Sequence, residues 1–338
     1  MDMGVSMAEL ARCPFCAIPN IRVGHAQDVE AGTGCTVIIG ENGLVAGVDV
    51  RGGGPATRET DLLAPRNMVE RIHAVVLSGG SAYGLEAGSG VMRYLEERQI
   101  GLDVGVGLVP LVCGASLFDL VVGDPQRRPD VAMGYAAAQN AFAGTASGAA
   151  DACGNIGAGT GATVGKLLGP ARMMKSGLGS YAVCWQGLYV GAMVAVNALG
   201  GVYDAESGAR LAGPLSEDGQ SILDSGSLLL HLANEQINQP FTANTTIGCI
   251  VTNARLTKAE AQKVASVGHD GYARTIFPVH TQADGDAIFA LSAAQADYPA
   301  DLVASIGARV MALAINQAVL TAEPAYGLAV ARDFCKRD

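Results

Sequence analysis

Residues 244–260 read NTTIGCIVTNARLTKAE, and they mark a change in the pattern of the chain. The β-branched and apolar side chains from Thr245 to Thr252 predict a strand. Thr257 and Glu260 then form a capping-box pattern, in which each side chain satisfies a backbone donor at the start of a helix. The preceding segment, about 204–243, is polar and rich in turn-forming residues, so we expect an exposed connection there. A strand and a helix therefore follow directly on a surface segment.

Strands and helices alternate in the same way upstream. Short strands are predicted at 36–39 and 44–50, and Glu41-Asn42-Gly43 between them is typical of a hairpin turn. A buried strand is predicted at 74–77, followed by a helix over about 82–98. This order indicates an α/β fold.

The two ends of the chain complete this pattern. Helices are predicted at 130–143 and 299–322, and two strand-like stretches surround Gly187. Residues 1–20 have no clear periodicity and are expected to form a loosely attached N-terminal arm. We therefore expect one α/β domain over 21–338.

Composition and charge exclude several classes of function. Of the 338 residues 49% are hydrophobic and 16% charged, which is enough apolar surface for a large core. The net charge is −10 with no basic block, so we expect no nucleic-acid partner. No long uninterrupted apolar run predicts a membrane helix, and the first residues do not resemble a secretory signal. A cytoplasmic location is the expectation.

Several familiar motifs are incomplete. The stretch 157–162 fits GxGxxA, but no Asp or Glu occurs at 180–200 to hold a ribose. A phosphate loop fails as well, because Thr160 and Leu167 stand where Gly and Ser/Thr are needed. Cys13 and Cys16 form a lone CxxC with no second half-site, so no metal is expected. The histidines form no HExxH pair, and no GxSxG elbow is present.

Thr245 alone would be interpreted as the first residue of a strand. The surrounding sequence, however, resembles the DmpA-type aminopeptidases and nylon-oligomer hydrolases, which are N-terminal-nucleophile enzymes. The resemblance rests on the quoted stretch and on HDGYARTIFPVHTQADGDAIFALS (269–292). It extends through VGHAQD (23–28), GTGCTVI (32–38), DVRGGGPATRETDLL (49–63), LSGGSAYGLEAGSGV (77–91), GATVGK (161–166) and AVNALGG (195–201).

The resemblance implies a four-layer αββα sandwich and a precursor that cuts itself between Asn244 and Thr245. The fragments would be 1–244 and 245–338, and Thr245 would become the nucleophile. The chemistry suits this residue, because its hydroxyl can attack the preceding carbonyl. Its freed α-amine, with an ordinary pKa of about 7.7–8.0, can then act as a general base.

Further site residues are implied by the same comparison. Lys166 matches a lysine beside the nucleophile, expected to lower the pKa of the amine and stabilise negative charge; a solvated loop lysine is the alternative. Asn197 matches an asparagine that donates to the oxyanion, although it could instead cap a loop. Asp284 and Asp286 match the acidic pair of nylon-oligomer hydrolases, while a plain turn is the other interpretation.

Substrate contacts are expected on the segment 114–119. Ala115 matches the position at which aminopeptidases of the family carry an acid that holds the substrate amine, and Asp119 is the other residue that could take that role. Phe118 matches a substrate-side aromatic residue, or belongs to the core. Tyr83 is expected either to line the site or to anchor its own turn.

The sequence thus predicts a self-processing amide hydrolase that acts on short linear amides or peptides without a cofactor. A homo-oligomer, a tetramer of cleaved heterodimers, is implied by the resemblance. The alternatives are an aminopeptidase releasing D-, L- or β-amino acids, an acyltransferase resembling ornithine acetyltransferase, and a binding protein that has lost processing. The acyltransferase lacks support before Thr245, because Ala243-Asn244 replaces the expected lysine-glycine.

Overall fold

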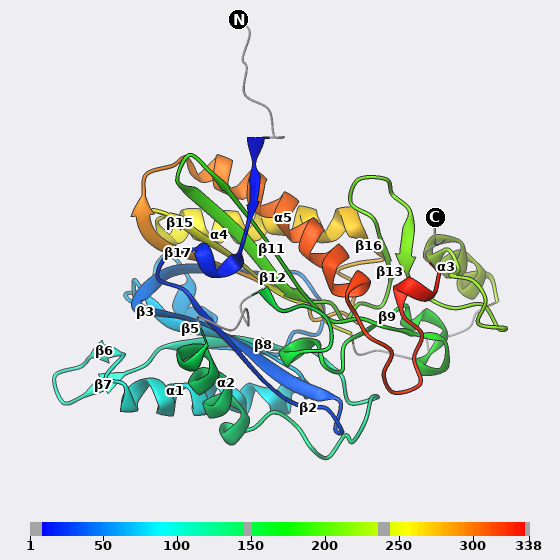
Figure 1. Cartoon of the computed structure of the whole chain (residues 1–338), viewed down its shortest axis with the longest axis horizontal. Helices are drawn as coiled ribbons and strands as arrows, with labels where there is room; N and C mark the ends of the chain where they lie inside the picture. The colour runs from blue at the N-terminus through cyan, green and yellow to red at the C-terminus, as the bar shows by residue number, and fades with distance from the viewer. Residues whose placement is uncertain (1–8, 145–150, 236–243, 335–338) are drawn as a thin grey trace, which may run out of the picture.

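The computed structural model describes residues 9–144, 151–235 and 244–334. Two β-sheets lie face to face, with helices covering both outer faces (Figure 1). The predicted α/β class and the four-layer αββα arrangement are therefore confirmed. The first eight residues of the expected arm and the last eight of the expected connection lie outside the described part.

The first sheet contains six strands in the order β1-β11-β12-β15-β17-β3. The hairpin around Gly187 supplies its β11 and β12, and β15 and β17 pair in parallel beside them. The bounds are β1 Ala11–Cys13, β11 Leu178–Trp185, β12 Leu188–Ala195, β15 Ile247–Ala254, β17 Ala287–Ala296 and β3 Thr33–Val50.

Strand β3 belongs to both sheets. Its second half pairs with β17, and its first half pairs with β2 and β5 of the second sheet. The predicted hairpin at Glu41-Asn42-Gly43 is therefore wrong. The pairing with β5 shifts between Ile39 and Leu44, so the turn-forming residues produce a bulge within one long strand. Both halves are flanked by other strands, which compete successfully with a hairpin between them.

The second sheet continues from β3 through β5 and β8 to β4, with β2 on the other side of β3. Helices α1 and α2 cover its outer face (Figure 1). The predicted helix over 82–98 begins with a 3₁₀ turn at Ser81–Glu86 and continues as α1. The bounds are β2 Arg22–Asp28, β4 Thr57–Arg58, β5 Ile72–Ser78, β8 Val112–Ser116, α1 Ala87–Glu97 and α2 Val131–Ala143.

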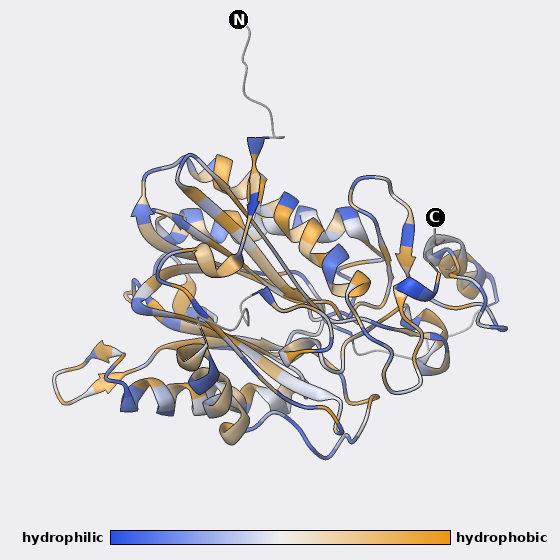
Figure 2. Ribbon diagram, in the orientation of Figure 1, coloured by the Kyte–Doolittle hydropathy of each residue, from blue (hydrophilic) through white to orange (hydrophobic). Residues whose placement is uncertain are grey.

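Helices α4 (Lys258–Thr275) and α5 (Ala300–Leu320) cover the outer face of the first sheet. The predicted capping box of Thr257 and Glu260 begins α4. Helix α5 is long and apolar enough to cross a membrane by length and composition, but 72% of its most apolar window is buried inside the protein. The buried apolar residues of α5 belong to the core cluster on this side of the first sheet, so α5 is a core helix. Figure 2 shows apolar and polar stretches alternating along its ribbon.

The core between the sheets explains the apolar run after Thr246. Ile247, Cys249 and Val251 point from β15 into the layer between the sheets, whereas Ile250 points toward α4 and α5. Because both faces of β15 are covered, its sequence is continuously apolar rather than alternating.

The described part of the N-terminal arm is not loosely attached. Strand β1 pairs with β11 at the edge of the first sheet. Phe15 and Ile18, only 0% and 1% exposed, insert into the layer between the sheets. These two side chains hold the arm in place. They were not predicted to be buried because two isolated apolar residues produce no periodic pattern in the sequence.

The remaining elements form small appendages. They are β6 Leu102–Asp103, β7 Leu108–Val109, β9 Thr163–Val164, β10 Met174–Lys175, β13 Gly201–Tyr203, β14 Arg210–Ala212, β16 Ile276–Phe277 and α3 Ser225–Asn234. Strands β9 and β10 pair with each other, and the Thr163 amide of β9 donates to Asn197, which lies just after β12. The turn after β9 carries Lys166.

Candidate active site

The segment around Thr245 meets the segment around Gly285 at one edge of the first sheet. Because β15 and β17 run in parallel, the residues that precede the two strands lie side by side. Asn244 forms an isolated parallel bridge with Asp284. Its backbone amide donates to Ala283 O at 3.0 Å. The topology thus brings the predicted cleavage point and the predicted acidic pair together.

Two hydrogen bonds hold Thr245 in place. Its backbone amide donates to Asn197 O at 3.0 Å, on the β12 side. Its hydroxyl hydrogen-bonds to the carbonyl oxygen of Asn244, so Oγ1 lies beside the peptide group that it would attack. Thr245 is only 4% exposed and Asn244 only 1%. In the uncut chain this hydroxyl is closed off from solvent.

Gly285 contacts both residues of the predicted cleavage point. Its backbone amide donates to Asn244 O at 2.9 Å. A Cβ atom at this position would lie 2.6 Å from Thr245 Oγ1 and 2.8 Å from Gly54 O. Only glycine therefore fits between the two aspartates. The sequence predicted the two aspartates but not the contact of Gly285 with the carbonyl group of Asn244.

Asp286 connects the site to the strand ladder. One of its carboxylate oxygens accepts from the Thr246 amide at 2.8 Å. The other accepts from His280, through the backbone amide at 3.1 Å and through Nδ1 at 2.8 Å. Asp286 is 1% exposed, and these donors hold its side chain against the backbone that leads into β15.

Asp284 is similarly buried, at 2% exposed. One oxygen accepts from the Thr281 amide at 2.9 Å and from its hydroxyl at 2.7 Å. Burial raises the pKa of Asp284 to about 6, and the nearby Asp286 carboxylate adds to that rise; the Thr281 hydrogen bonds and Lys166 oppose it. A carboxyl group with this pKa can exchange a proton near neutral pH.

Lys166 and Thr245 share an acceptor on Asn197. The ammonium of Lys166 donates to Asn197 O at 3.0 Å and to Asn197 Oδ1 at 2.7 Å. The same Oδ1 accepts from the amide of Thr163 at 3.0 Å, and Asn197 Nδ2 donates to Phe118 O at 2.8 Å. Every polar atom of the Asn197 side chain is therefore in use, and its orientation is fixed.

The predicted alternative of a solvated loop lysine is wrong for Lys166, which is 1% exposed. Burial lowers its pKa to about 7, although Asp284, Asp119 and Asp286 favour the charged form. A lysine with this pKa exists in both forms at neutral pH, so it can either accept a proton or supply positive charge.

Asp119 and Lys175 are buried ionisable residues near this site that lie outside the predicted catalytic set. Asp119 accepts from the Thr33 hydroxyl and the Gly80 amide, each at 2.7 Å. Burial raises the pKa of Asp119 to about 6. Lys175 is 0% exposed, and it was not predicted because it belongs to no recognised sequence motif.

The predicted substrate contacts are scattered. Phe118 reaches the site through its backbone carbonyl, as the acceptor of Asn197. Ala115 lies in β8 and packs into the apolar layer between the sheets. Tyr83 is 62% exposed, with the Arg128 guanidinium 3.9 Å from its ring centroid. The structure brings Tyr83 to a surface recess lined by Glu86 and Arg128, and its role at the catalytic site stays a prediction.

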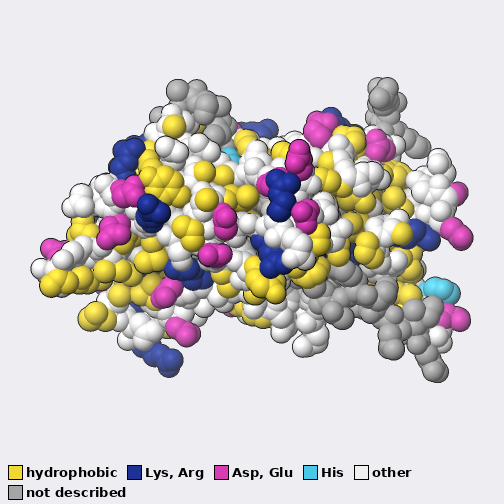
Figure 3. Space-filling view, turned by 90° about the horizontal axis from the view of Figure 1, so that it is seen from below, with side chains coloured by type: hydrophobic (Ala, Val, Ile, Leu, Met, Phe, Trp, Pro, Cys, Tyr) yellow, Lys and Arg dark blue, Asp and Glu magenta, His cyan; other side chains and the backbone are white. Residues whose placement is uncertain are grey.

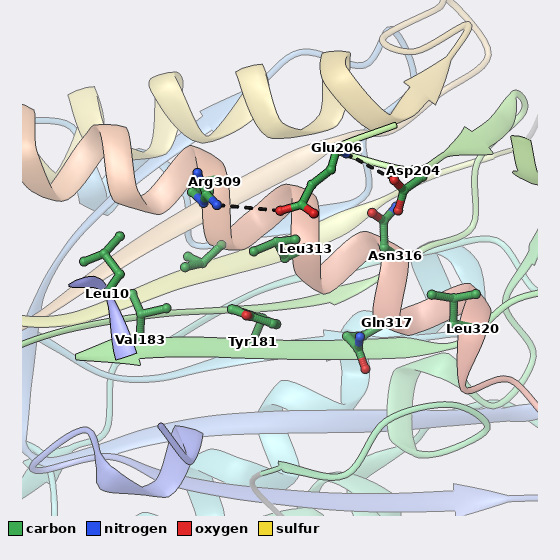
Figure 4. Close-up of a pocket in the computed structure, with 11 residues that line it drawn as sticks. Leu10, Tyr181, Val183, Asp204, Glu206, Arg309, Leu313, Asn316, Gln317 and Leu320 are labelled. Carbon is green, nitrogen blue, oxygen red and sulfur yellow. Dashed lines mark hydrogen bonds and ion pairs between the residues drawn. The ribbon is translucent and has the colours of Figure 1, made fainter. Parts of the chain in front are cut away.

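Four cavities of the described chain lie away from the predicted catalytic residues. One of about 270 Å³ opens between β11 and α5 and is lined by Tyr181, Arg309 and Asn316 among others (Figure 4). None of the predicted catalytic residues lines it. Within the described residues no three His, Cys, Asp or Glu side chains are arranged to hold a metal ion. On the face visible in Figure 3, acidic and basic side chains are intermingled rather than gathered in a basic patch.

The two-sheet sandwich with helices on both outer faces has the αββα architecture of the N-terminal-nucleophile hydrolase fold. Residues 15–331 match the family described as Peptidase family S58. The chain belongs to this family and is a peptidase or amide hydrolase.

Relatives with similar sequences carry two kinds of name. An uncharacterized aminopeptidase of Mycobacterium leprae (strain TN) is 41% identical over 338 residues, covering 92% of this chain and 91% of that protein. A 6-aminohexanoate-oligomer endohydrolase of Kocuria sp. (strain KY2) is 32% identical over 294 residues, covering 83% of this chain and 75% of that protein.

A solved structure supports the fold independently. The L-aminopeptidase D-Ala-esterase/amidase of Ochrobactrum anthropi, described as a variant of the Ntn hydrolase fold, superposes with a TM-score of 0.67. The alignment covers 93% of this chain and 88% of that one at 19% sequence identity. At this identity the likeness establishes the fold alone.

Proposed function

We propose that this protein is the precursor of an amide hydrolase that cuts itself before Thr245 and then uses Thr245 as its nucleophile. The observation that carries the proposal is the arrangement around one peptide bond. The Thr245 hydroxyl contacts the Asn244 carbonyl oxygen, and the Gly285 amide donates to that oxygen at 2.9 Å.

These contacts support an acyl shift within the chain. Thr245 Oγ1 attacks the carbonyl carbon of Asn244, and the negative charge that develops on the carbonyl oxygen is stabilised by the Gly285 N–H. The C–N bond breaks, the nitrogen leaves as the α-amine of Thr245, and an ester joins the two residues. One water molecule then hydrolyses the ester and leaves a carboxylate on Asn244.

A proton acceptor is needed before the α-amine exists. Lys166, with a pKa of about 7 and bonded to the same Asn197 carbonyl as Thr245, is the group that we assign to this step. After cleavage the α-amine takes over as general base, and the Lys166 ammonium disfavours protonation of that amine.

The environment of Asn244 also favours cleavage. Among the described contacts, neither polar atom of its buried side chain has a hydrogen-bond partner. A buried unpaired amide costs about 1–3 kcal/mol. Breaking the peptide bond frees this residue to move, so release of the unpaired amide contributes to the driving force.

For the mature enzyme we propose hydrolysis of short linear amides or peptides through an acyl-enzyme on Thr245. Asp284 and Asp286 would orient the α-amine and exchange its proton. The second candidate is an aminopeptidase, favoured by the name of the 41% identical relative. The two differ in whether a free substrate amine is required.

Mass spectrometry of denatured, freshly purified protein tests self-cleavage. We expect two fragments, with the lighter one beginning at Thr245, and a single 34.4 kDa chain for Thr245→Ala. Thr246→Ala is the matched control, because it removes a neighbouring buried hydroxyl and should still cleave. A wild-type chain that stays intact, or a light fragment with another N-terminus, would contradict the proposal.

A further inference from the structure

Lys175 lies against the loop that carries the catalytic lysine. It is the last residue of β10 and pairs with Thr163 of β9. Thr163 in turn donates to Asn197 Oδ1 through its amide at 3.0 Å and its hydroxyl at 3.3 Å. A single residue, Thr163, therefore connects Lys175 to Asn197, which binds Lys166.

Three carbonyl groups surround the Lys175 side chain. Nζ donates to Gly159 O and Ala162 O, each at 3.1 Å, and to Ser176 O. A lysine ammonium has three N–H donors, whereas the neutral amine has two. Three acceptors therefore match the charged form.

Lys166 is bound differently. In the described structure its two side-chain hydrogen bonds both go to Asn197. One position on its nitrogen remains for a proton or a lone pair, as a residue that exchanges protons requires. Burial lowers the pKa of Lys175 to about 7, as it does for Lys166, so the two lysines beside this loop differ in their hydrogen bonds: Lys175 donates to three carbonyl groups, and Lys166 donates to two acceptors on one residue.

The glycine-rich segment 157–162 is shaped by this arrangement. A Cβ atom at Gly159 would lie 2.0 Å from Leu178 N, and one at Gly161 would lie 1.8 Å from Gly32 O. The glycines that imitate a dinucleotide fingerprint are thus required by close backbone packing. The Cβ atom of Asp119 lies 2.9 Å from the same Gly161 Cβ position. A buried lysine and a buried aspartate therefore both lie against the loop.

We propose that Lys175 is a positioning residue for the reaction of Thr245. Its ammonium binds the carbonyl oxygens of Gly159 and Ala162 and so fixes the turn after β9. That turn carries Lys166 and, through Thr163, binds Asn197, so both residues are held beside the nucleophile. This inference rests on the proposed function.

The matched pair Lys175→Met and Lys258→Met tests it. Lys258 is also buried, at 5% exposed, and also donates to three carbonyls, of Leu62, Asn67 and Val69 at 2.8–3.2 Å. It lies at the start of α4, outside the network of Thr245 contacts. Both substitutions should lower the melting temperature. Only Lys175→Met should slow self-cleavage of the folded protein, by about 100-fold, since a small misplacement of catalytic groups has an effect of this size.

The matured fraction of Lys175→Met provides a second readout. We expect kcat to fall while KM changes less than about twofold, and the lower limb of the kcat–pH profile to rise. The limb rises because Lys166 is no longer held where it disfavours a charged α-amine. A purely structural role would leave the limb unchanged.

Lys175→Arg covers the case in which the methionine variant does not fold. A planar guanidinium cannot donate to the same three carbonyl oxygens as a compact ammonium does, so this variant should also cleave slowly. The inference is overturned if folded Lys175→Met or Lys175→Arg cleaves at the wild-type rate, or if Lys258→Met slows cleavage equally. Wild-type protein that never cleaves contradicts the proposed function instead.

Discussion

Gly285 leaves the space that the Thr245 hydroxyl occupies: a methyl group on it would come within 2.6 Å of Thr245 Oγ1. Gly285→Ala should therefore displace the nucleophile and slow self-cleavage by about 100-fold or more. Gly54→Ala is the matched control, because a Cβ there would lie 3.8 Å from the nearest atom, Asp284 O. Time courses of fragment appearance on denaturing gels measure both rates. Equal rates for the two variants would show that the contact has no role in the reaction.

The pH dependence of turnover tests the electrostatic role of Lys166. Its ammonium disfavours a second positive charge, so the pKa of the Thr245 α-amine should lie below the ordinary value of about 7.7–8.0. In the mature enzyme the lower limb of the pH–rate profile should follow that lowered pKa. Lys166→Met should raise the limb or abolish turnover, whereas Lys263→Met, on the exposed face of α4, should change neither. A full-activity Lys166→Met enzyme with an unchanged profile would exclude this role.

Substrate blocking separates the two candidate functions. Ala115 cannot pair with a substrate ammonium, and Asp119 is 2% exposed with both oxygens bound to Thr33 and Gly80. We expect kcat/KM for a short amide, such as an oligomer of 6-aminohexanoate, to change less than about tenfold on N-acetylation. That corresponds to under ~1.4 kcal/mol in the transition state. A loss beyond roughly a thousandfold would indicate that an acid holds the amine, and would place the enzyme with the aminopeptidases.

Stability should depend on pH through Asp119. Burial raises its folded pKa from 3.8 to about 6, so the folded state binds more protons than the unfolded chain between these values. Its contribution to stability is present below about pH 3.8 and is lost as the pH rises through about 6. Asp119→Asn has no such loss. In a Thr245→Ala background, its free energy of unfolding relative to the parent should increase from pH 4 to pH 7, as urea denaturation would show. A constant difference would mean that the group titrates alike in both states.

Local patterns predicted the elements around Thr245 because those elements are fixed by neighbouring residues. The Thr257–Glu260 capping box and the apolar run from Ile247 depend on contacts that lie close in the sequence or on simple burial. The prediction of a hairpin at Glu41-Asn42-Gly43 was wrong because the conformation of these residues depends on pairing with β5 and β17, which are distant in the sequence. Turn-forming residues cannot distinguish a turn from a bulge without those partners.

The predicted catalytic residues were found by resemblance to a family, and the structure adds the contacts among them. Lys175 and the Gly285 amide were not predictable, because one is surrounded by backbone carbonyls and the other acts through a backbone N–H. Neither leaves a pattern of side chains in the sequence. Phe15 and Ile18 likewise show their role only when both sheets are present.

The position of β15 and β17 inside the first sheet has a consequence for refolding. Both strands follow Thr245 in the chain, yet they lie between β12 and β3, which precede it. A chain cut before Thr245 consists of two interleaved polypeptides, and a denatured mature enzyme must bring two separate molecules together again. Refolding of the cut protein should therefore be second order and fail on dilution, whereas uncut Thr245→Ala should refold at a rate independent of concentration. The uncut protein can refold as a single chain, whereas the folded state of the cut protein would persist only as long as it does not unfold. The lifetime of the mature protein would then be set by its unfolding rate.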